Sequence, residues 1–495
     1  MLFSSFNYLV FLPIVFGLYW VLPDKFRKPL LLLASYFFYM SWLPKYGLLL
    51  FGLTIANYFL GLLISKSVDR KKLFLTIAVS INLGCLCFFK YTNFLLDSLW
   101  QGLRGFTQVT GVTLAQTTNT PMFDILLPLG ISFFAFEFIH YVVDVYKGSP
   151  PMRNFFDFAL FGAFFPSQIA GPIKRFQDFS KQLIHPPVFS KQDFNDGVVL
   201  ILQGLFKKVC LGDMLAQLIV DPGYANPAAL GTLDAWIVFF AFTFQVFFDF
   251  SGYTDIGRGS ALLFGYRVPE NFNLPFLSAN FLEIWRRWHI SLSTWLRDYL
   301  YIPLGGSHCS AWAQRRNLFL TMALGGLWHG AAWHYVFFGC IQGVILATTR
   351  DWQKYTDKHP TLSVMKKSPW WHWSAVVATF WSWTVLLVIF RAPSVTHAFS
   401  MYAKGFSSSP AGEITTTFMT STLPVTLVLY GLYCITCALA NRTIEKEQAL
   451  PAVAGWVANA WKQSVPARAI AYTAMAVVIL AFAPGHVQPF VYFQF

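Results

Sequence analysis

The chain has 495 residues, of which 56% are hydrophobic and only 12% are charged, about half the charged share of a typical soluble domain. This composition excludes an ordinary soluble protein, and the absence of alternating polar residues in the long apolar runs excludes a transmembrane barrel. The net charge of +13 does not indicate a nucleic-acid partner, because the basic residues collect in loops between apolar runs, where they report orientation in a membrane.

Many apolar runs approach or reach the roughly 20 residues with which a helix crosses a bilayer. They cover residues 5–22, 30–45, 47–65, 73–89, 123–146, 196–220, 234–257, 373–390, 418–440 and 469–485. Such runs must be helical, because lipid offers no water to unpaired backbone groups. The first run lacks a basic n-region and a small-residue cleavage site, so we interpret it as a transmembrane helix rather than a signal peptide. We therefore predict an all-α polytopic membrane protein, one domain over residues 1–495, with about 10–12 transmembrane helices and further re-entrant or interfacial helices.

The lysines and arginines predict the orientation of this bundle. If the N-terminus lies outside and the chain changes sides at each span, most of the 36 Lys and Arg fall on the cytoplasmic side. The residues that fall outside are Lys45, Lys90, Arg104, Arg391 and Lys404. This asymmetry follows the positive-inside rule and predicts that both termini are extracytoplasmic. Residues 91–122 are then expected to form an extracytoplasmic loop.

Two segments interrupt the simple alternation of spans. Within residues 161–178, the stretch Phe164–Pro172 interrupts an apolar run with two prolines and a glycine, which predicts a re-entrant segment. Residues 271–300 combine tryptophans with Arg286 and Arg287, and an arginine at the bilayer centre costs at least about 2.5 kcal/mol. We expect 271–300 to form short tilted or interfacial helices on the cytoplasmic side.

His329 is the strongest candidate for a catalytic residue. It follows Trp328 in an apolar run, residues 317–347, that is divided by Gly325-Gly326 and by Gly330. Each part is too short for a comfortable crossing, so we expect a re-entrant hairpin, or two short helices, with His329 near the tip. An imidazole is expensive to bury in a membrane and is suited to proton transfer near neutral pH. The alternative is a hydrogen-bonded core histidine without a catalytic role.

A second candidate, His289, lies in the aromatic and basic block 281–299. It is either a second active-site histidine or a residue that only orients the helices around His329. Trp285, Trp288 and Asp298 are expected to shape a cytoplasmic tunnel and the wall beneath His329, with Trp328 as a further support.

Several polar features predict structure rather than chemistry. The carboxylates within apolar runs are expected to pair with arginines or other polar groups inside the bundle; they are Glu137, Asp144, Asp249 and Asp255. The sequence contains no Gly-x-Ser-x-Gly elbow and no phosphate-binding loop. No histidine pair with metal-ligand spacing recurs, so we predict no metal site.

Several motifs together resemble the membrane-bound O-acyltransferase family and, within it, the membrane subunits of bacterial alginate O-acetyltransferases. The resemblance extends over essentially the whole chain. The motifs are Leu127–Phe134, Phe165–Pro172, Asn271–Phe276, Trp285–Tyr299, Tyr301–Gly306 and Gly325–Ala331.

This resemblance implies an O-acyltransferase with a thinned helical bundle and a catalytic core at about residues 121–350. It implies that His329 matches the active-site histidine and His289 the second motif histidine. The implied acyl donor is cytoplasmic acetyl-CoA, used as a substrate, with no bound cofactor. The implied acceptor is an exported polysaccharide such as alginate, with peptidoglycan, cellulose or teichoic acid as alternatives.

The resemblance also implies a location in the bacterial inner membrane and a periplasmic acetyltransferase partner with a serine-hydrolase-like fold. We expect such a partner because we find no extracytoplasmic segment large enough to hold a polymer. Two rival classes stay open, a membrane transporter and a non-catalytic scaffold. A transporter would be expected to carry internal repeats and paired broken helices, whereas the polar features here cluster in residues 271–334.

The aromatic segment Pro489–Phe495 supports two interpretations. Its rings could anchor the preceding helix at the membrane interface. Alternatively, the segment folds back into the extracytoplasmic cavity and Tyr492 relays the acyl group outward, as in related acyl-transfer systems with an aromatic C-terminal motif.

Overall fold

The computed structural model describes residues 1–110, 120, 122–169, 171–428, 430–431, 465–482 and 490–491. Within these ranges the secondary structure is helical, apart from one isolated β-bridge between Phe272 and Trp288. Among the described helices, those long and apolar enough to cross a membrane are Pro44–Lys66, Lys71–Thr110, Thr232–Leu263 and Pro369–Arg391. The predicted all-α membrane fold is confirmed.

The α-helices follow one another as α1 (Phe6–Val21), α2 (Asp24–Met40), α3 (Pro44–Lys66), α4 (Lys71–Leu86), α5 (Thr92–Thr110), α6 (Ile131–Tyr146), α7 (Phe155–Ala163), α8 (Phe176–Ile184), α9 (Lys191–Leu205), α10 (Asp221–Ala225), α11 (Thr232–Leu263), α12 (Phe281–Arg287), α13 (Ile290–Leu296), α14 (Ala311–His329), α15 (Trp333–Lys358), α16 (Pro360–Met365), α17 (Pro369–Arg391), α18 (Val395–Gly405), α19 (Glu413–Thr420) and α22 (Val465–Ala481). Short π-helices are η1 (Cys87–Tyr91), η3 (Phe206–Asp213), η4 (Ala216–Val220) and η7 (Arg297–Tyr301). Single 3₁₀ turns are η2 (Phe165–Ser167), η5 (Pro227–Ala229) and η6 (Pro275–Leu277).

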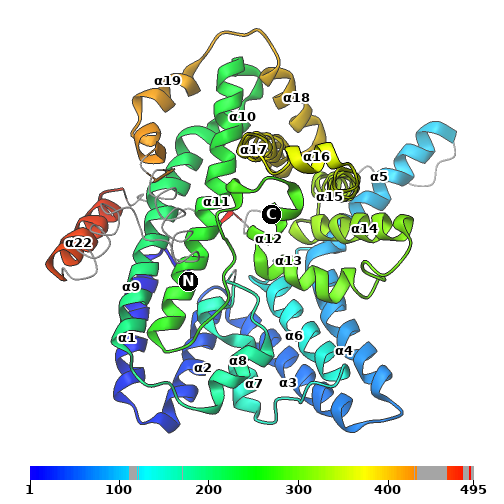
Figure 1. Ribbon diagram of the computed structural model, residues 1–495. Helices are drawn as coiled ribbons and strands as arrows, with labels where there is room; N and C mark the ends of the chain where they lie inside the picture. Colours follow the sequence, from blue (N-terminus) through cyan, green and yellow to red (C-terminus); the bar gives the residue numbers. More distant parts are fainter. Residues whose placement is uncertain are drawn as a thin grey trace.

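The long helix α11 joins two groups of helices (Figure 1). On one side, α3 packs against α4 and α6, and α2 packs against α7. On the other, α14 packs against α15, and α17 contacts both α11 and α15. Helices α9 and α11 approach closely through glycines, because a Cβ atom on Gly204 would lie 2.5 Å from the carbonyl oxygen of Gly252. Small residues at helix contacts are typical of packing in lipid.

The carboxylates inside the bundle are paired, as predicted. Glu137 contacts Lys174 at 2.8 Å, Asp249 contacts Lys208 at 2.5 Å and Asp255 contacts Lys207 at 2.6 Å. Asp144 accepts hydrogen bonds from Gln177 and Tyr299, each at 2.6 Å. The closest charged partners are lysines, and an arginine, Arg258, lies 3.8 Å from Asp255. The long apolar stems of the lysines can cross a packed interior while the ammonium group reaches an acid.

The structure corrects three boundaries. Residues 92–110, expected in a loop, form α5, which continues the α4 helix and projects from the body of the protein (Figure 1). The fifth predicted span begins at Ile131 rather than at residue 123, because Gly130 adopts a left-handed conformation that starts α6. The pair Gly325-Gly326 does not break the helix, since α14 is continuous to His329. By contrast, the short helices predicted within 271–300 are confirmed as η6, α12, α13 and η7.

Candidate active site

His329 is the last residue of α14, at the turn of a helical hairpin. Gly330 follows in an extended conformation and α15 begins at Trp333, so the predicted turn beside His329 is confirmed. The two helices have 19 and 26 residues and are longer than the predicted short parts, because each continues beyond the apolar run. That the hairpin is re-entrant stays a prediction. A side chain at residue 330 would collide with the ring of Tyr335, because a Cβ atom there would lie 2.1 Å from a ring carbon. Glycine therefore allows the chain to turn tightly directly after His329.

Close packing of α14 on α15 explains why Gly326 lies within a continuous helix and not at the predicted break. A Cβ atom on Gly326 would lie 2.3 Å from the carbonyl oxygen of Tyr335 and 2.9 Å from the Cα atom of Gly339. A Cβ atom on Gly325 would meet only a methyl group of Leu296, at 3.4 Å. Gly326 thus provides a contact surface for α15 within a continuous helix.

His289 occupies an unusual backbone position between α12 and α13. Its φ and ψ angles, 45° and 52°, lie in the left-handed region that few residues other than glycine adopt. The strand-like segment that begins at Asn271 holds it there. The Ile290 amide donates to the Asn271 carbonyl oxygen at 3.0 Å, and the Ser291 amide donates to Asn271 Oδ1 at 3.2 Å. Such strain, maintained by neighbouring contacts, is often found at functional sites.

Trp328 stands between the two histidines. Its ring centroid lies 5.0 Å from that of His329 and 6.1 Å from that of His289. Phe250 of α11 packs edge-on to His289 at 4.6 Å, and Phe390 of α17 packs edge-on to His329 at 5.2 Å. Both histidines are buried, His289 completely and His329 with 7% exposure. Residues far apart in sequence therefore form one buried aromatic cluster that contains two imidazoles.

Of the other predicted support residues, Trp285 and Trp288 lie in the segment that carries His289, whereas Asp298 lies elsewhere. Trp288 packs against Phe272 at 5.1 Å and Trp383 at 5.5 Å, beside His289, and the Trp285 indole donates to Gln342 at 3.3 Å. These tryptophans hold the segment that carries His289 against α15 and α17. Asp298 belongs to a different cluster.

That cluster is built around Arg175, which contacts Asp298 at 2.5 Å and the hydroxyl of Tyr299 at 2.6 Å. Arg297 also pairs with Asp298, at 2.7 Å. Burial alone would raise the pKa of Asp298, but the hydrogen bond from Arg297 and the charge of Arg175 outweigh it and lower that pKa. Asp298 is thus an ionised anchor that ties η7 to the loop before α8.

Residues Phe490 and Val491 lie inside the bundle. The Val491 amide donates to Asp249 Oδ2 at 2.6 Å, and both side chains are buried. Phe490 stacks on Tyr253 at 4.7 Å and contacts Phe250, the ring that packs on His289, at 5.5 Å. Tyr492 lies outside the described residues.

Two residues that contact the end of α14, Lys90 and Tyr91, were not predicted from the sequence. Lys90, expected on the extracytoplasmic side after the 73–89 span, donates from Nζ to the carbonyl oxygens of Trp328 at 2.6 Å and His329 at 3.0 Å. The hydroxyl of Tyr91 donates to the Leu327 carbonyl oxygen at 3.0 Å. A lysine directly after a long apolar run was the available signal, but it predicts a helix end as readily as an interior contact.

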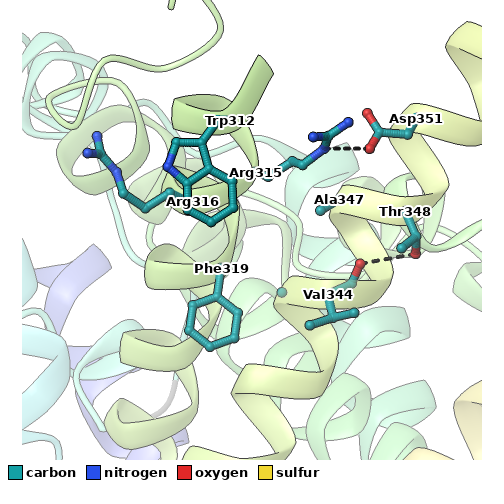
Figure 2. A pocket seen from close by; sticks show the side chains of 9 residues that line it. Trp312, Arg315, Arg316, Phe319, Val344, Ala347, Thr348 and Asp351 are labelled. Carbon is teal, nitrogen blue, oxygen red and sulfur yellow. Dashed lines mark hydrogen bonds and ion pairs between the residues drawn. The ribbon is translucent and has the colours of Figure 1, made fainter. Parts of the chain in front are cut away.

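The groove in Figure 2 lies at the opposite end of the same hairpin. Phe319, Val344 and Ala347 provide apolar walls, and Arg315 pairs with Asp351 at 2.7 Å at the rim. Its volume is about 370 Å³. Phe319 and Arg315 lie roughly 15 and 21 Å along α14 from His329, so the groove is separate from the two histidines.

Metal ligation is not supported by the described part of the chain, where no group of three or more His, Cys, Asp or Glu residues could hold a metal ion. The aromatic cluster brings together two imidazoles, one indole and the surrounding apolar rings. Such surroundings exclude water and suit proton transfer between bound groups.

The family and the relatives to which this chain is similar are named for O-acyl transfer. The family described as MBOAT, membrane-bound O-acyltransferase, matches residues 150–389. The chain is 43% identical to the probable alginate O-acetylase AlgI of Pseudomonas aeruginosa, over 82% of this chain and 75% of that protein. It is 39% identical to AlgI of Azotobacter vinelandii over the full length of both. It is also 35% identical to a peptidoglycan O-acetyltransferase of Helicobacter pylori, over 70% of each chain.

Proposed function

The chain belongs to the membrane-bound O-acyltransferase family, and we propose that it carries an acetyl group from cytoplasmic acetyl-CoA across the membrane for O-acetylation of an exported polysaccharide. Relatives similar over most of the chain are named alginate O-acetylases, which makes alginate the first candidate polymer. Peptidoglycan is the second, since a 35% identical relative is named for it. The protein would lie in the bacterial inner membrane with both termini extracytoplasmic, as the distribution of basic residues indicates.

His329 is the proposed general base. The single observation that carries this role is its place at the buried turn of the α14–α15 hairpin, one ring away from His289. A hydroxyl oxygen attacks the thioester carbonyl, and His329 takes up the hydroxyl proton. The carbon–sulfur bond then breaks, and the imidazolium returns the proton to the leaving thiolate. Proton transfer of this kind contributes about 10²–10⁴-fold to a rate.

Tyr492 is the proposed first acceptor. Support comes from Phe490 and Val491, which are buried against α11, with Phe490 in contact with Phe250, the ring that packs on His289. An aryl ester is more reactive than an alkyl ester, so an acetyl group on the phenol can move on. Its next acceptor would be the serine of an extracytoplasmic, serine-hydrolase-like partner.

Replacement of Tyr492 by phenylalanine tests this relay, because it removes the oxygen and keeps the ring. The substitution should abolish polymer acetylation at unchanged membrane levels, and mass spectrometry should detect an acetylated 489–495 peptide in the wild type. Normal acetylation by Tyr492→Phe would leave the segment as an interfacial anchor.

The overall function can be tested in an alginate-producing bacterium that lacks its own corresponding acetylase. Expression of this chain should restore O-acetyl groups to the exported polymer. The variant His329→Ala should not, whereas His308→Ala, which removes an exposed histidine before α14, should match the wild type. Equal restoration by His329→Ala would rule out the proposed base. Unacetylated alginate with acetylated peptidoglycan would redirect the proposal to the second polymer.

His289 has two proposed roles that one variant separates. If it acts with His329, His289→Ala should lose activity while remaining folded. Full activity would reduce His289 to a residue that packs between Phe250 and Trp328.

A further inference from the structure

The C-terminal end of α14 needs hydrogen-bond donors from elsewhere in the chain. The last carbonyl groups of any helix have no partner within that helix. Here the chain leaves the helix through an extended Gly330, so the usual left-handed glycine cap does not form. The carbonyl oxygens of Leu327, Trp328 and His329 instead accept hydrogen bonds from Tyr91 and Lys90.

The two donors are consecutive residues of one π-helical turn. Lys90 and Tyr91 close η1, which interrupts the long helix Lys71–Thr110 between α4 and α5. Such π-helical turns inside α-helices are frequent at functional sites. In this protein the turn presents an ammonium and a hydroxyl to the same helix end.

Charge makes the contact specific. A helix C-terminus carries a partial negative charge, equivalent to about half an electron, and a cation beside it is stabilising. The Lys90 ammonium lies 2.6 Å from the Trp328 carbonyl oxygen and 5.9 Å from the centre of the Trp328 ring, which also attracts cations. A lysine within an apolar helix is costly, so a position that offers two carbonyls and an aromatic face accounts for its presence.

We propose that Lys90 is a positioning residue for His329: with Tyr91 it caps α14 and fixes the backbone that carries the imidazole. This inference rests on the proposed role of His329 as the base. Lys90 holds the carbonyl group of His329 itself, at 3.0 Å, so loss of the ammonium frees the residue whose ring must face the reacting hydroxyl. A misplacement of about 1 Å can cost as much as 10²-fold in rate.

The test uses the full-length protein purified in detergent and measures kcat and KM for acetyl-CoA hydrolysis. Lys90→Met removes the ammonium and keeps an unbranched chain; it should lower kcat by about 10- to 100-fold with KM within about twofold of the wild type. Lys90→Arg, which retains a cation, should recover part of kcat. Lys45→Met, at an exposed lysine near the start of α3, is the control and should behave like the wild type.

The outcomes separate this inference from the proposed function. If His329→Ala is inactive but Lys90→Met keeps a wild-type kcat, Lys90 is not a positioning residue. If His329→Ala is active, the proposed base itself is wrong. If Lys90→Met does not fold, Tyr91→Phe decides: it loses only one hydroxyl, and its kcat should fall about threefold or more at constant KM. A wild-type kcat for Tyr91→Phe would then overturn the proposal.

Discussion

Replacing Lys174 alone should destabilise the protein more than replacing Lys174 and Glu137 together. Their charged groups are almost fully buried, with 2% and 4% of the side chains exposed. Lys174 Nζ donates to both Glu137 oxygens, at 2.8 Å and 3.0 Å, and to Ser167 Oγ at 2.8 Å. The residue before Lys174 connects this ion pair to the candidate active site. The Ile173 amide donates to Ser291 Oγ, and Ser291 lies two residues beyond His289.

The size of the stability loss follows from the charge that each substitution leaves unpaired. Lys174→Met strands a buried carboxylate, which typically costs about 3–5 kcal/mol, whereas removing both charges of a buried pair is often nearly neutral. Adding Glu137→Gln keeps an acceptor for the Lys174 backbone amide, which donates to Glu137 Oε1 at 3.2 Å. The double variant should therefore be more stable than Lys174→Met by at least about 2 kcal/mol.

Unfolding of the purified variants in detergent measures this difference, provided that unfolding is reversible. Lys181→Met is the control, because Lys181 and Asp178 form a distant pair, at 4.0 Å, with about three quarters of each side chain exposed. It should unfold like the wild type. A Lys174→Met protein as stable as the double variant would contradict the predicted cost of an unpaired buried carboxylate.

Two further predictions concern the hairpin and the Asp298 cluster. Gly326→Ala should separate α14 from α15 and sharply reduce the yield of folded protein, whereas Gly325→Ala, which meets only a Leu296 methyl, should fold normally; equal yields would contradict the close contact. The lowered pKa of Asp298 means that its carboxylate stabilises the protein above the ordinary value near 4 and that this contribution is lost as pH falls through the lowered pKa. The difference in unfolding temperature between wild type and Asp298→Asn should thus be constant from about pH 5 to 8 and shrink below about pH 4; a difference that changes between pH 6 and 8 would assign it to another group.

Local chemistry explains what the sequence could predict. The apolar runs required helices, and the tryptophans and arginines around His289 required a layer of short helices rather than a span, as found in α12 and α13. A histidine followed by glycine at the middle of a long apolar run marked the turn of a hairpin, and His329 lies there. Each of these predictions depends on residues that are close in sequence.

Long-range contacts explain what the sequence could not predict. Lys90 was predicted only to lie on the extracytoplasmic side, because its partners, the carbonyl groups at the end of α14, are more than 200 positions away. The same holds for Asp249 and the Val491 amide, which are 242 residues apart. Gly326 was read as a helix break because only the packed α15 reveals that it serves a close contact.

The central claim is that His329 acts as the base in acyl transfer. Purified protein supplied with acetyl-CoA labelled in the acetyl group should release free CoA and labelled product, and His329→Ala should lower this rate by at least about 10²-fold at an unchanged folded fraction. Equal rates for the two proteins would contradict the claim.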